Sequence, residues 1–214
     1  MHHSVINLIK IKENLKNNNS LPNIIAVSKT FSIENIIPLI EHGHLDFGEN
    51  KVQEAIEKWS SIKKKHSNLK LHMIGKLQTN KVKYVLPLFD FIHSLDNLKL
   101  AEKISNEQDK QNLKIKIFIQ VNVGKEPQKS GLRTEELDEF YNICTRKLNL
   151  NIIGLMCLPP KEDDKKIYFE EMQFHKNRLK LSELSMGMSE DYIQAYTFGA
   201  TYLRIGSKIF GKRI

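Results

Sequence analysis

The stretch IIAVSKTFS, residues 24–32, carries the pattern from which the fold can be predicted. Its first four residues form an apolar run, which is typical of a strand that is buried on both faces of a parallel sheet. The run ends abruptly at Ser28 and Lys29, where the chain turns toward a stretch with helical spacing. The segment therefore predicts a buried strand that delivers a lysine at its carboxyl end.

Short apolar runs of the same kind recur along the chain, and each is followed by a stretch of helix length. We predict strands at residues 23–28, 44–49, 69–75, 89–95, 115–123, 150–158, 179–187 and 201–207. Alternating strands and helices imply parallel pairing, and eight such units in 214 residues predict an α/β fold, a single (β/α)8 TIM barrel. We expect one domain over residues 1–214. A doubly wound open sheet is the alternative on this pattern.

Both ends of the chain favour the barrel over the open sheet. Few residues follow the eighth predicted strand, so little room is left for a final helix. An extra helix precedes the first strand instead, and its apolar spacing predicts an inner face. That face comprises Val5, Leu8, Ile9, Lys12 and Leu15.

Local signals place several helix ends. Asn50 stands where an N-cap is expected, ahead of the apolar stripe of the next helix. Thr134, followed by two glutamates, opens a later helix. Gly43 fits a helix C-cap before the second strand. Pro38 lies inside the first helix after residues 24–32 and is expected to kink it.

The composition limits the classes of function. The formal net charge is +8, but the positive charge comes almost entirely from lysines scattered among glutamates, which is typical of solvated helix faces. The arginines are Arg133, Arg146, Arg178, Arg204 and Arg213. We therefore expect no nucleic acid as a partner.

The cysteines and the apolar segments predict a soluble, cytoplasmic protein. Cys144 and Cys157 have no C-x-x-C spacing, so neither a disulfide framework nor a zinc site is expected. The first ten residues lack the apolar core of a signal peptide. No stretch approaches the ~18 uninterrupted apolar residues of a membrane-spanning helix.

The carboxyl ends of the predicted strands are rich in polar residues and glycines. In (β/α)8 barrels this is the end that carries the chemistry. The ends in chain order are Ser28-Lys29, Gly48-Glu49-Asn50, His72 to Gly75, His93-Ser94, Gln120 to Asn122, Met156-Cys157, Ser185 to Ser189, and Arg204 to Ser207.

The last two strand ends predict a phosphate site. SMGMS (185–189) and RIGSKIFG (204–211) each place small residues between a strand and the next helix, where backbone amides and a helix start can approach an anion. The loops after strands seven and eight are the usual phosphate site of this fold.

Lys29 would lie across the barrel mouth from this phosphate site. An amine that loses hydration there has a lowered pKa and adds to aldehydes. A Schiff-base lysine opposite a phosphate site fits pyridoxal 5′-phosphate. Arg204, projecting between them, would oppose protonation of the pyridine nitrogen and weaken the cofactor as an electron sink. The alternative is that Lys29 faces solvent or pairs with a phosphate.

Five blocks of sequence, in order, resemble the pyridoxal phosphate homeostasis protein family, also called the YggS/PROSC family. They are AVSKTFSIENIIPLIEHGHLDFGENKVQEA, HMIGKLQTNKVK, VNVGKEPQKSGL, IIGLMCLPP and LSMGMSEDYIQAYTFGATYLRIGSKIFGKR. The resemblance runs from about Ile24 to Arg213. It implies a barrel like the N-terminal domain of alanine racemase, with pyridoxal phosphate bound as an aldimine to Lys29.

The resemblance also implies roles for further residues. Asn50 would lie near the cofactor ring, and Arg204 would take the ring-nitrogen position. The phosphate cradle would comprise Ser185, Gly187, Gly206 and Ser207. Lys129 belongs to the PQKSGL motif, but the sequence assigns it no role.

The function implied is that of a carrier without major catalytic activity, which holds pyridoxal phosphate and releases it to apo-enzymes in intracellular homeostasis. We expect a monomer. A pyridoxal-phosphate-dependent amino-acid racemase is the alternative, but two-base proton transfer needs a second positioned base. The candidates for that base are His72, His93 and Tyr202. A barrel isomerase or aldolase acting on sugar phosphates is a third possibility.

Overall fold

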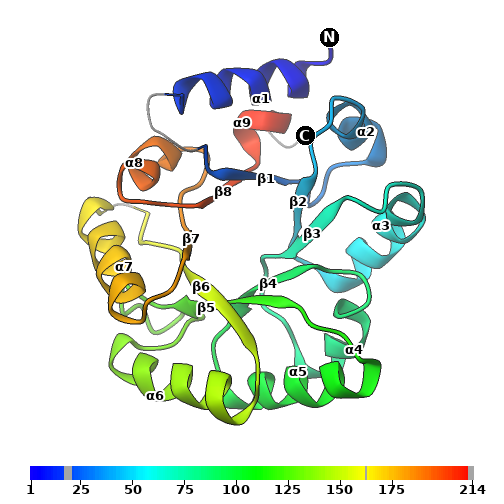
Figure 1. Cartoon of the computed structure of the whole chain (residues 1–214). Coiled ribbons are helices and arrows are strands. Elements are labelled where there is room, and N and C mark those ends of the chain that lie inside the picture. Colours follow the sequence, from blue (N-terminus) through cyan, green and yellow to red (C-terminus); the bar gives the residue numbers. More distant parts are fainter. Residues whose placement is uncertain (17–20, 162, 212–214) are drawn as a thin grey trace.

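The strands form a closed barrel in sequence order. The computed structural model describes residues 1–16, 21–161 and 163–211, and all neighbouring strands pair in parallel (Figure 1). The strands are β1 (Asn23–Val27), β2 (Asp46–Glu49), β3 (Lys70–Met73), β4 (Phe91–Leu95), β5 (Lys116–Val121), β6 (Asn151–Cys157), β7 (Glu183–Ser185) and β8 (Tyr202–Ile205).

Helices surround the barrel on its outer side (Figure 1). The α-helices are α1 (His3–Asn14), α2 (Ile33–Glu41), α3 (Val52–Lys65), α4 (Val82–Val85), α5 (Leu98–Gln111), α6 (Leu137–Asn142), α7 (Lys166–Arg178), α8 (Tyr192–Thr197) and α9 (Ser207–Phe210). Shorter turns flank two of them, namely the 3₁₀ helices η1 (Thr79–Lys81) and η2 (Thr134–Glu136) and the π-helical turn η3 (Ile143–Lys147).

The predicted barrel is confirmed, and the open sheet is excluded. Each observed strand lies within its predicted range, and β1 pairs with β8 from Asn23↔Tyr202 to Ala26↔Ile205. That pairing closes the sheet, so no strand edge is left unpaired. Closure also brings the carboxyl ends of the first and last strands next to each other.

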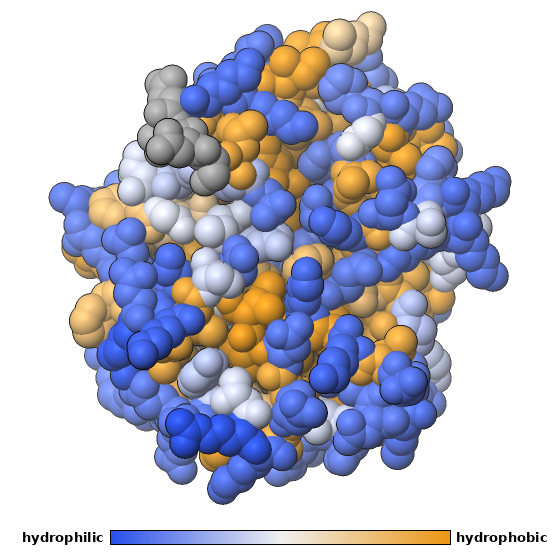
Figure 2. Space-filling model, viewed as in Figure 1, coloured by the Kyte–Doolittle hydropathy of each residue, from blue (hydrophilic) through white to orange (hydrophobic). Residues whose placement is uncertain are grey.

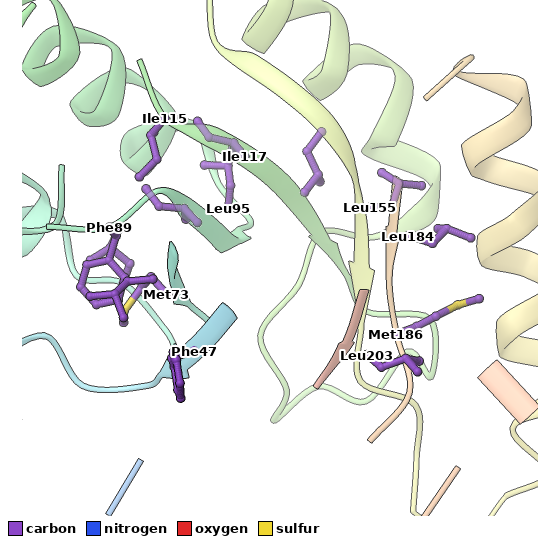
Figure 3. Close-up of a cluster of buried hydrophobic side chains, with 14 of the residues drawn as sticks. Phe47, Met73, Phe89, Leu95, Ile115, Ile117, Leu155, Leu184, Met186 and Leu203 are labelled. Atoms are coloured by element: carbon purple, nitrogen blue, oxygen red, sulfur yellow. The ribbon is translucent and has the colours of Figure 1, made fainter. Parts of the chain in front are cut away.

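Two hydrophobic cores result from the alternation of side chains along each strand. The larger core lies between the barrel and its helices, and Figure 3 shows part of it, including Phe47, Leu184 and Leu203. The smaller core fills the barrel interior. It comprises Ile25, Phe91, Phe118, Met156 and Tyr202. On the surface, hydrophilic residues dominate the face seen in Figure 2, with smaller hydrophobic patches between them.

The extra helix α1 covers the outside of the barrel together with the short helix α9 (Figure 1). Asn7 Nδ2 donates to the Ile209 carbonyl at 3.1 Å. The predicted inner face of α1 is only partly correct, because Ile11 is buried where Ile9 and Lys12 are half-buried. The predicted Val5, Leu8 and Leu15 are buried.

Three of the predicted helix signals have different outcomes. Asn50 is not an N-cap, since α3 begins at Val52 and its N-cap is Lys51. Helix α2 continues through Pro38, because the proline deprives only the carbonyl of Glu34 of a helical partner and Glu34 is exposed to water. Gly43 follows the C-cap of α2 with φ +85°, as predicted.

The later helix does open at Thr134, as predicted. Its first three residues form the 3₁₀ turn η2 before α6 begins at Leu137. Such turns are common at helix starts.

Candidate cofactor site at the carboxyl end of the barrel

Lys29 lies one residue beyond the buried Ser28 at the end of β1, and it is half-buried. The backbone on both sides of it is held by α3. Lys58 Nζ donates to the Ser28 carbonyl at 3.0 Å, and the Thr30 amide donates to Glu54 Oε1 at 2.7 Å. Thr30 adopts φ +68°, a left-handed conformation that β-branched residues rarely adopt. Helix α3 therefore fixes the turn that presents Lys29.

The contacts to this turn belong to a cluster between β2 and α3, which we call the outer cluster and which comprises Ser28, Glu49, Glu54, Lys58 and Trp59. Glu49 is fully buried at its centre. Its Oε1 accepts from Ser28 Oγ at 2.8 Å, from Lys58 Nζ at 3.0 Å and from Trp59 Nε1 at 3.0 Å. A buried carboxylate is tolerated only when it is paired in this way.

The pKa of Glu54 reflects the same contacts. Burial alone would raise the pKa of this carboxyl, but the hydrogen bonds from the Thr30 amide and from Lys58 outweigh burial, so the pKa lies below its ordinary value. Glu54 therefore stays ionised and keeps its bond to the turn that carries Lys29.

Arg204 projects from β8 and is buried, with 4% of its surface exposed. Its Nη1 donates to Ser185 Oγ at 2.6 Å, and its Nη2 donates to the Cys157 carbonyl at 2.7 Å. Among the described residues, no carboxylate forms an ion pair with this guanidinium. Burial lowers the pKa of Arg204, but a guanidinium remains protonated at neutral pH. Within the described part of the chain, the hydrogen bonds of this buried cation thus go to two neutral oxygens.

Lys29 and Arg204 come from adjacent strands. In the β1–β8 pairing, Ile25 stands opposite Arg204 and Ala26 opposite Ile205. Lys29 follows at the same end of the barrel. Closure of the sheet thus places residues that are 175 positions apart in sequence at one edge.

The two predicted phosphate loops are joined to each other. The Arg204 amide donates to the Gly187 carbonyl at 3.0 Å, and the Lys208 amide donates to Ser189 Oγ at 3.3 Å. The helices that follow contain six and four residues, too few for the strong helix-start dipole expected from the sequence. Any anion bound here would contact mainly loop amides and side chains.

The two glycines of these loops differ. Gly187 has φ +89°, and a Cβ added to it would lie 2.6 Å from Ala195 Cβ, so its own packing requires glycine. Gly206 has φ −111°, and an added Cβ would meet Val27 at an ordinary 3.5 Å. The chain's own packing does not explain Gly206, whereas close approach of a ligand to the backbone would.

Some buried polar atoms at this end of the barrel lack hydrogen-bond partners among the described residues. Asn50 Oδ1 is one, and Glu49 Oε2, on the same strand end, is another. Buried polar atoms are nearly always satisfied, so such an atom indicates a bound molecule or water. With a lysine, a buried cation and an unsatisfied amide oxygen at one edge, the residues present fit an anionic aldehyde such as pyridoxal phosphate.

Ser185 occupies a different place from the rest of the predicted cradle. It is fully buried, and its hydroxyl lies between Arg204 and His93 Nδ1, which is 2.9 Å away. Ser207 is exposed at the start of α9. The hydroxyl of Ser185 therefore contacts the site through Arg204.

A chain of polar groups continues from Ser185 into the barrel interior, and sequence reasoning did not find it. His93 Nε2 lies 2.9 Å from His72 Nδ1, and His72 Nε2 lies 3.1 Å from Asp46 Oδ1. The signal in the sequence was the presence of polar residues inside runs that were predicted to be buried strands. We call Asp46, His72, His93, Ser185 and Arg204 the interior chain.

Lys129 lies on the loop between β5 and η2 and reaches the segment that follows β6. Its Nζ pairs with Glu126 and approaches the Pro159 carbonyl at 3.4 Å. The structure therefore gives Lys129 a local partner and no contact with the interior chain or the outer cluster.

The fold places this protein in the class built on the alanine racemase N-terminal barrel. Residues 6–213 match the family model for the N-terminal domain of alanine racemase, which covers nearly the whole chain. The structure of diaminopimelate decarboxylase from Helicobacter pylori has the same fold, with a TM-score of 0.74 at 14% identity over 97% of this chain. This chain covers 62% of that one, so only the barrel is shared.

The chain belongs to the pyridoxal phosphate homeostasis protein family. The member from Aquifex aeolicus is 38% identical over 199 residues, which cover 89% of this chain and 86% of the relative. The member from Escherichia coli strain K12 is 35% identical, with 89% and 85% covered.

The structure of this protein is also similar to a solved structure, which agrees with its assignment to this family. PipY of Synechococcus elongatus, solved with pyridoxal phosphate bound, has a TM-score of 0.88 at 30% identity. The match covers 97% of this chain and all of PipY. The same protein without pyridoxal phosphate matches with a TM-score of 0.89.

Within residues 1–16, 21–161 and 163–211, no helix is both long and apolar enough to cross a bilayer.

Proposed function

We propose that this protein binds pyridoxal 5′-phosphate through Lys29 and serves as a carrier that holds the cofactor and releases it to apo-enzymes. The observation that carries the proposal is the buried guanidinium of Arg204, which forms no ion pair with a carboxylate among the described residues and which stands at the strand end next to that of Lys29. A buried cation of this kind is costly unless a bound acceptor or anion completes its environment.

Pyridoxal phosphate, when bound, supplies an aldehyde that reacts with a primary amine and a ring that withdraws electrons when its nitrogen is protonated. Lys29 supplies the amine. Arg204 would hold the cofactor at its ring nitrogen, where a permanent cation would oppose protonation of that nitrogen. We assign Asn50 to the ring, and Gly187, Gly206 and Ser207 to the phosphate.

Ser185 acts on the cofactor through Arg204. Its oxygen accepts from Nη1, which orients the plane of the guanidinium. The Cys157 carbonyl accepts from Nη2, so both terminal nitrogens are held while the group remains charged. The outer cluster likewise holds the backbone on both sides of Lys29.

The candidate bases argue for a carrier and against a racemase. His72 and His93 are fully buried, and each has its Nδ1 in a hydrogen bond within the interior chain. Tyr202 is buried in the barrel interior, where burial raises its pKa to about 12. None of the three is placed to take a proton from a substrate at the mouth.

Racemase activity remains the second candidate, because the fold is that of the alanine racemase N-terminal domain. Lys29 alone would support slow exchange by one base. We therefore expect, for the alanine enantiomers, at most a rate far below that of a dedicated racemase.

The proposal includes a cytoplasmic location and a monomeric state, with transient contacts to apo-enzymes as the delivery step. The location is supported by two free cysteines, both buried, whose thiol pKa values burial raises to about 12. Such thiols are inert and do not need an oxidising compartment.

The test is the visible absorption spectrum of purified protein with pyridoxal phosphate, before and after borohydride reduction. We expect the wild type to show the band of a covalent lysine adduct, and reduction to fix the cofactor on the peptide that contains Lys29. Lys29→Ala removes the band. Lys76→Ala, which removes an exposed lysine after β3, is the control and leaves the band unchanged.

Transfer is tested by mixing the loaded protein with an apo-enzyme that requires pyridoxal phosphate and following recovery of its activity. Recovery faster than unassisted release into buffer supports a carrier. A wild type without the band, or label on another lysine, would overturn the assignment of Lys29.

A further inference from the structure

The interior chain links the mouth of the barrel to its opposite end. Asp46 is the first residue of β2, and Arg204 lies near the end of β8. Between them, His72 stacks on Phe91 with ring centroids 4.2 Å apart, and His93 stacks on Phe118 at the same distance. The polar atoms of the chain thus run through the hydrophobic core of the barrel interior, where water cannot replace a missing partner.

The direction of every hydrogen bond in the chain follows from its two ends. A carboxylate only accepts, so His72 Nε2 carries the proton that Asp46 receives. The Nδ1 of a neutral His72 then accepts from His93 Nε2, and the Nδ1 of a neutral His93 accepts from the Ser185 hydroxyl. The oxygen of Ser185 is left to accept from Arg204, which only donates.

Burial supports the neutral histidines that this order requires. It lowers the pKa of His72, despite the opposing effect of Asp46, and lowers that of His93 further, with help from His72 and Arg204. For Asp46, burial alone would raise the pKa, but the hydrogen bond from His72 and nearby positive charge, that of Lys70 included, outweigh burial and hold the pKa below its ordinary value. The only charges on the chain are therefore those at its ends.

We propose that Asp46, His72 and His93 are positioning residues for Arg204, and that a one-directional hydrogen-bond chain makes Asp46 a remote counter-charge of the buried guanidinium. Each link points its hydrogen toward Asp46 and its lone pair toward Arg204. The aligned dipoles add to the effect of Asp191, whose charge reaches Arg204 although its ion pair is with Lys165. This leaves the guanidinium fully charged, with donors available toward the mouth.

The advantage of this arrangement rests on the proposed role of Arg204 at the cofactor ring. A carboxylate in direct contact would occupy two donors of the guanidinium in a bidentate pair and would place a negative charge beside an anionic cofactor. The chain instead uses one donor, at Nη1, and keeps the carboxylate at the far end of the barrel.

The first test uses the protein without cofactor, so it does not depend on the proposed function. Long-range ¹H–¹⁵N spectra of histidine-labelled protein at pH 7 distinguish the two neutral tautomers from the imidazolium, with assignments from His72→Gln and His93→Gln. We expect both histidines to be neutral and protonated on Nε2. A proton on Nδ1 of either histidine, or an imidazolium at either position, would contradict the proposed direction of the hydrogen bonds.

The second test compares two variants at His93. Glutamine can accept from Ser185 with Oε1 and donate to His72 with Nε2, so His93→Gln preserves the direction of the chain. His93→Leu breaks it and leaves the Ser185 hydroxyl without its acceptor. We expect His93→Leu to weaken pyridoxal phosphate binding about tenfold and to shift the absorption maximum of the bound cofactor, and His93→Gln to stay within about twofold.

A purely structural role for His93 would change stability without moving the absorption maximum. Wild-type binding and an unshifted maximum in His93→Leu, or a loss in His93→Gln as large as in His93→Leu, would contradict the proposal. If His93→Leu does not fold, the tautomers of the wild type still decide. If the wild type binds no pyridoxal phosphate, the proposed function fails while the tautomers test the chain alone.

Discussion

Asp46 and Glu49 lie three residues apart on β2, yet they compensate buried cations in opposite ways. Glu49 lies in the outer cluster and touches its cation directly, with 3.0 Å between Oε1 and Lys58 Nζ. Asp46 faces the barrel interior and reaches Arg204 only through two histidines and a serine. The outer cluster holds the turn that carries Lys29, and the interior chain reaches Arg204.

The difference follows from what each cation does. Lys58 is structural, because its three bonds go to the Ser28 carbonyl and to the carboxylates of Glu49 and Glu54, and they fix the Lys29 turn. In the proposed function Arg204 keeps donors for the cofactor, and Asp46 acts on it from a distance. A direct ion pair suits a cation such as Lys58, which only holds the backbone. A counter-charge that acts through intervening hydrogen bonds suits a cation that is proposed to bind a cofactor.

Breaking the outer cluster should have the largest effect on stability. Lys58→Met leaves Glu49 buried without a cation, and we expect the free energy of unfolding in urea to fall by about 3–5 kcal/mol. The double variant Glu49→Gln/Lys58→Met removes both charges, while the glutamine still accepts from Trp59 and Ser28. It should recover much of the loss. Equal losses in the single and double variants would contradict the claim that the unpaired charge of Glu49 causes the loss.

Acid should break the interior chain before the outer cluster. Burial lowers the pKa values of His72 and His93, and that of His44 to about 4, from 6.5. Unfolded imidazoles therefore bind protons below pH 6.5 that the folded ones exclude, so stability is full above 6.5 and falls as the pH drops. The expected slope is about 1.4 kcal/mol per pH unit for each histidine.

Urea unfolding at pH 8, 7, 6 and 5 measures this slope. His93→Gln should reduce it by the share of one histidine, and His66→Gln, at the exposed end of α3, controls for the loss of an imidazole. The outer cluster loses its Glu54 contribution only below pH 4.5, because that pKa is lowered from 4.5. A free energy of unfolding that stays constant from pH 8 to 5 would contradict neutral buried histidines.

The smallest expected effects are those of alanine substitutions at Gly187 and Gly206, which separate a role in packing from a role in cofactor binding. Gly187→Ala should cost about 1–3 kcal/mol, because it combines a positive φ with a Cβ 2.6 Å from that of Ala195. Gly206→Ala should change stability by less than about 0.5 kcal/mol but weaken the binding of pyridoxal phosphate. Thermal unfolding and cofactor titration of the two variants separate the effects. Gly206→Ala that binds as the wild type would remove Gly206 from the phosphate site.

The barrel was predictable because its strands are encoded locally. Each apolar run is bounded by polar residues, and eight such runs leave one simple closure. The ends of helices were less predictable. The N-cap of α3 is Lys51 and not Asn50, whose side chain remains without a bond at Oδ1.

Only those parts of the candidate site that lie at the ends of strands could be predicted from the sequence. Lys29 and Arg204 could be placed at strand ends from the sequence. The interior chain could not, because it joins Asp46, His72 and His93 through the closed barrel, and such contacts depend on register and side-chain direction. The outer cluster depends likewise on how α3 packs on β2.

The most direct test of the account is an experimental structure of the protein with pyridoxal phosphate. We expect the cofactor to be bonded to Lys29 Nζ, with a guanidinium nitrogen of Arg204 in hydrogen-bond contact with the ring nitrogen, while Ser185 and the Cys157 carbonyl keep their bonds to Arg204. A cofactor attached elsewhere, or a ring nitrogen that faces away from Arg204, would contradict it.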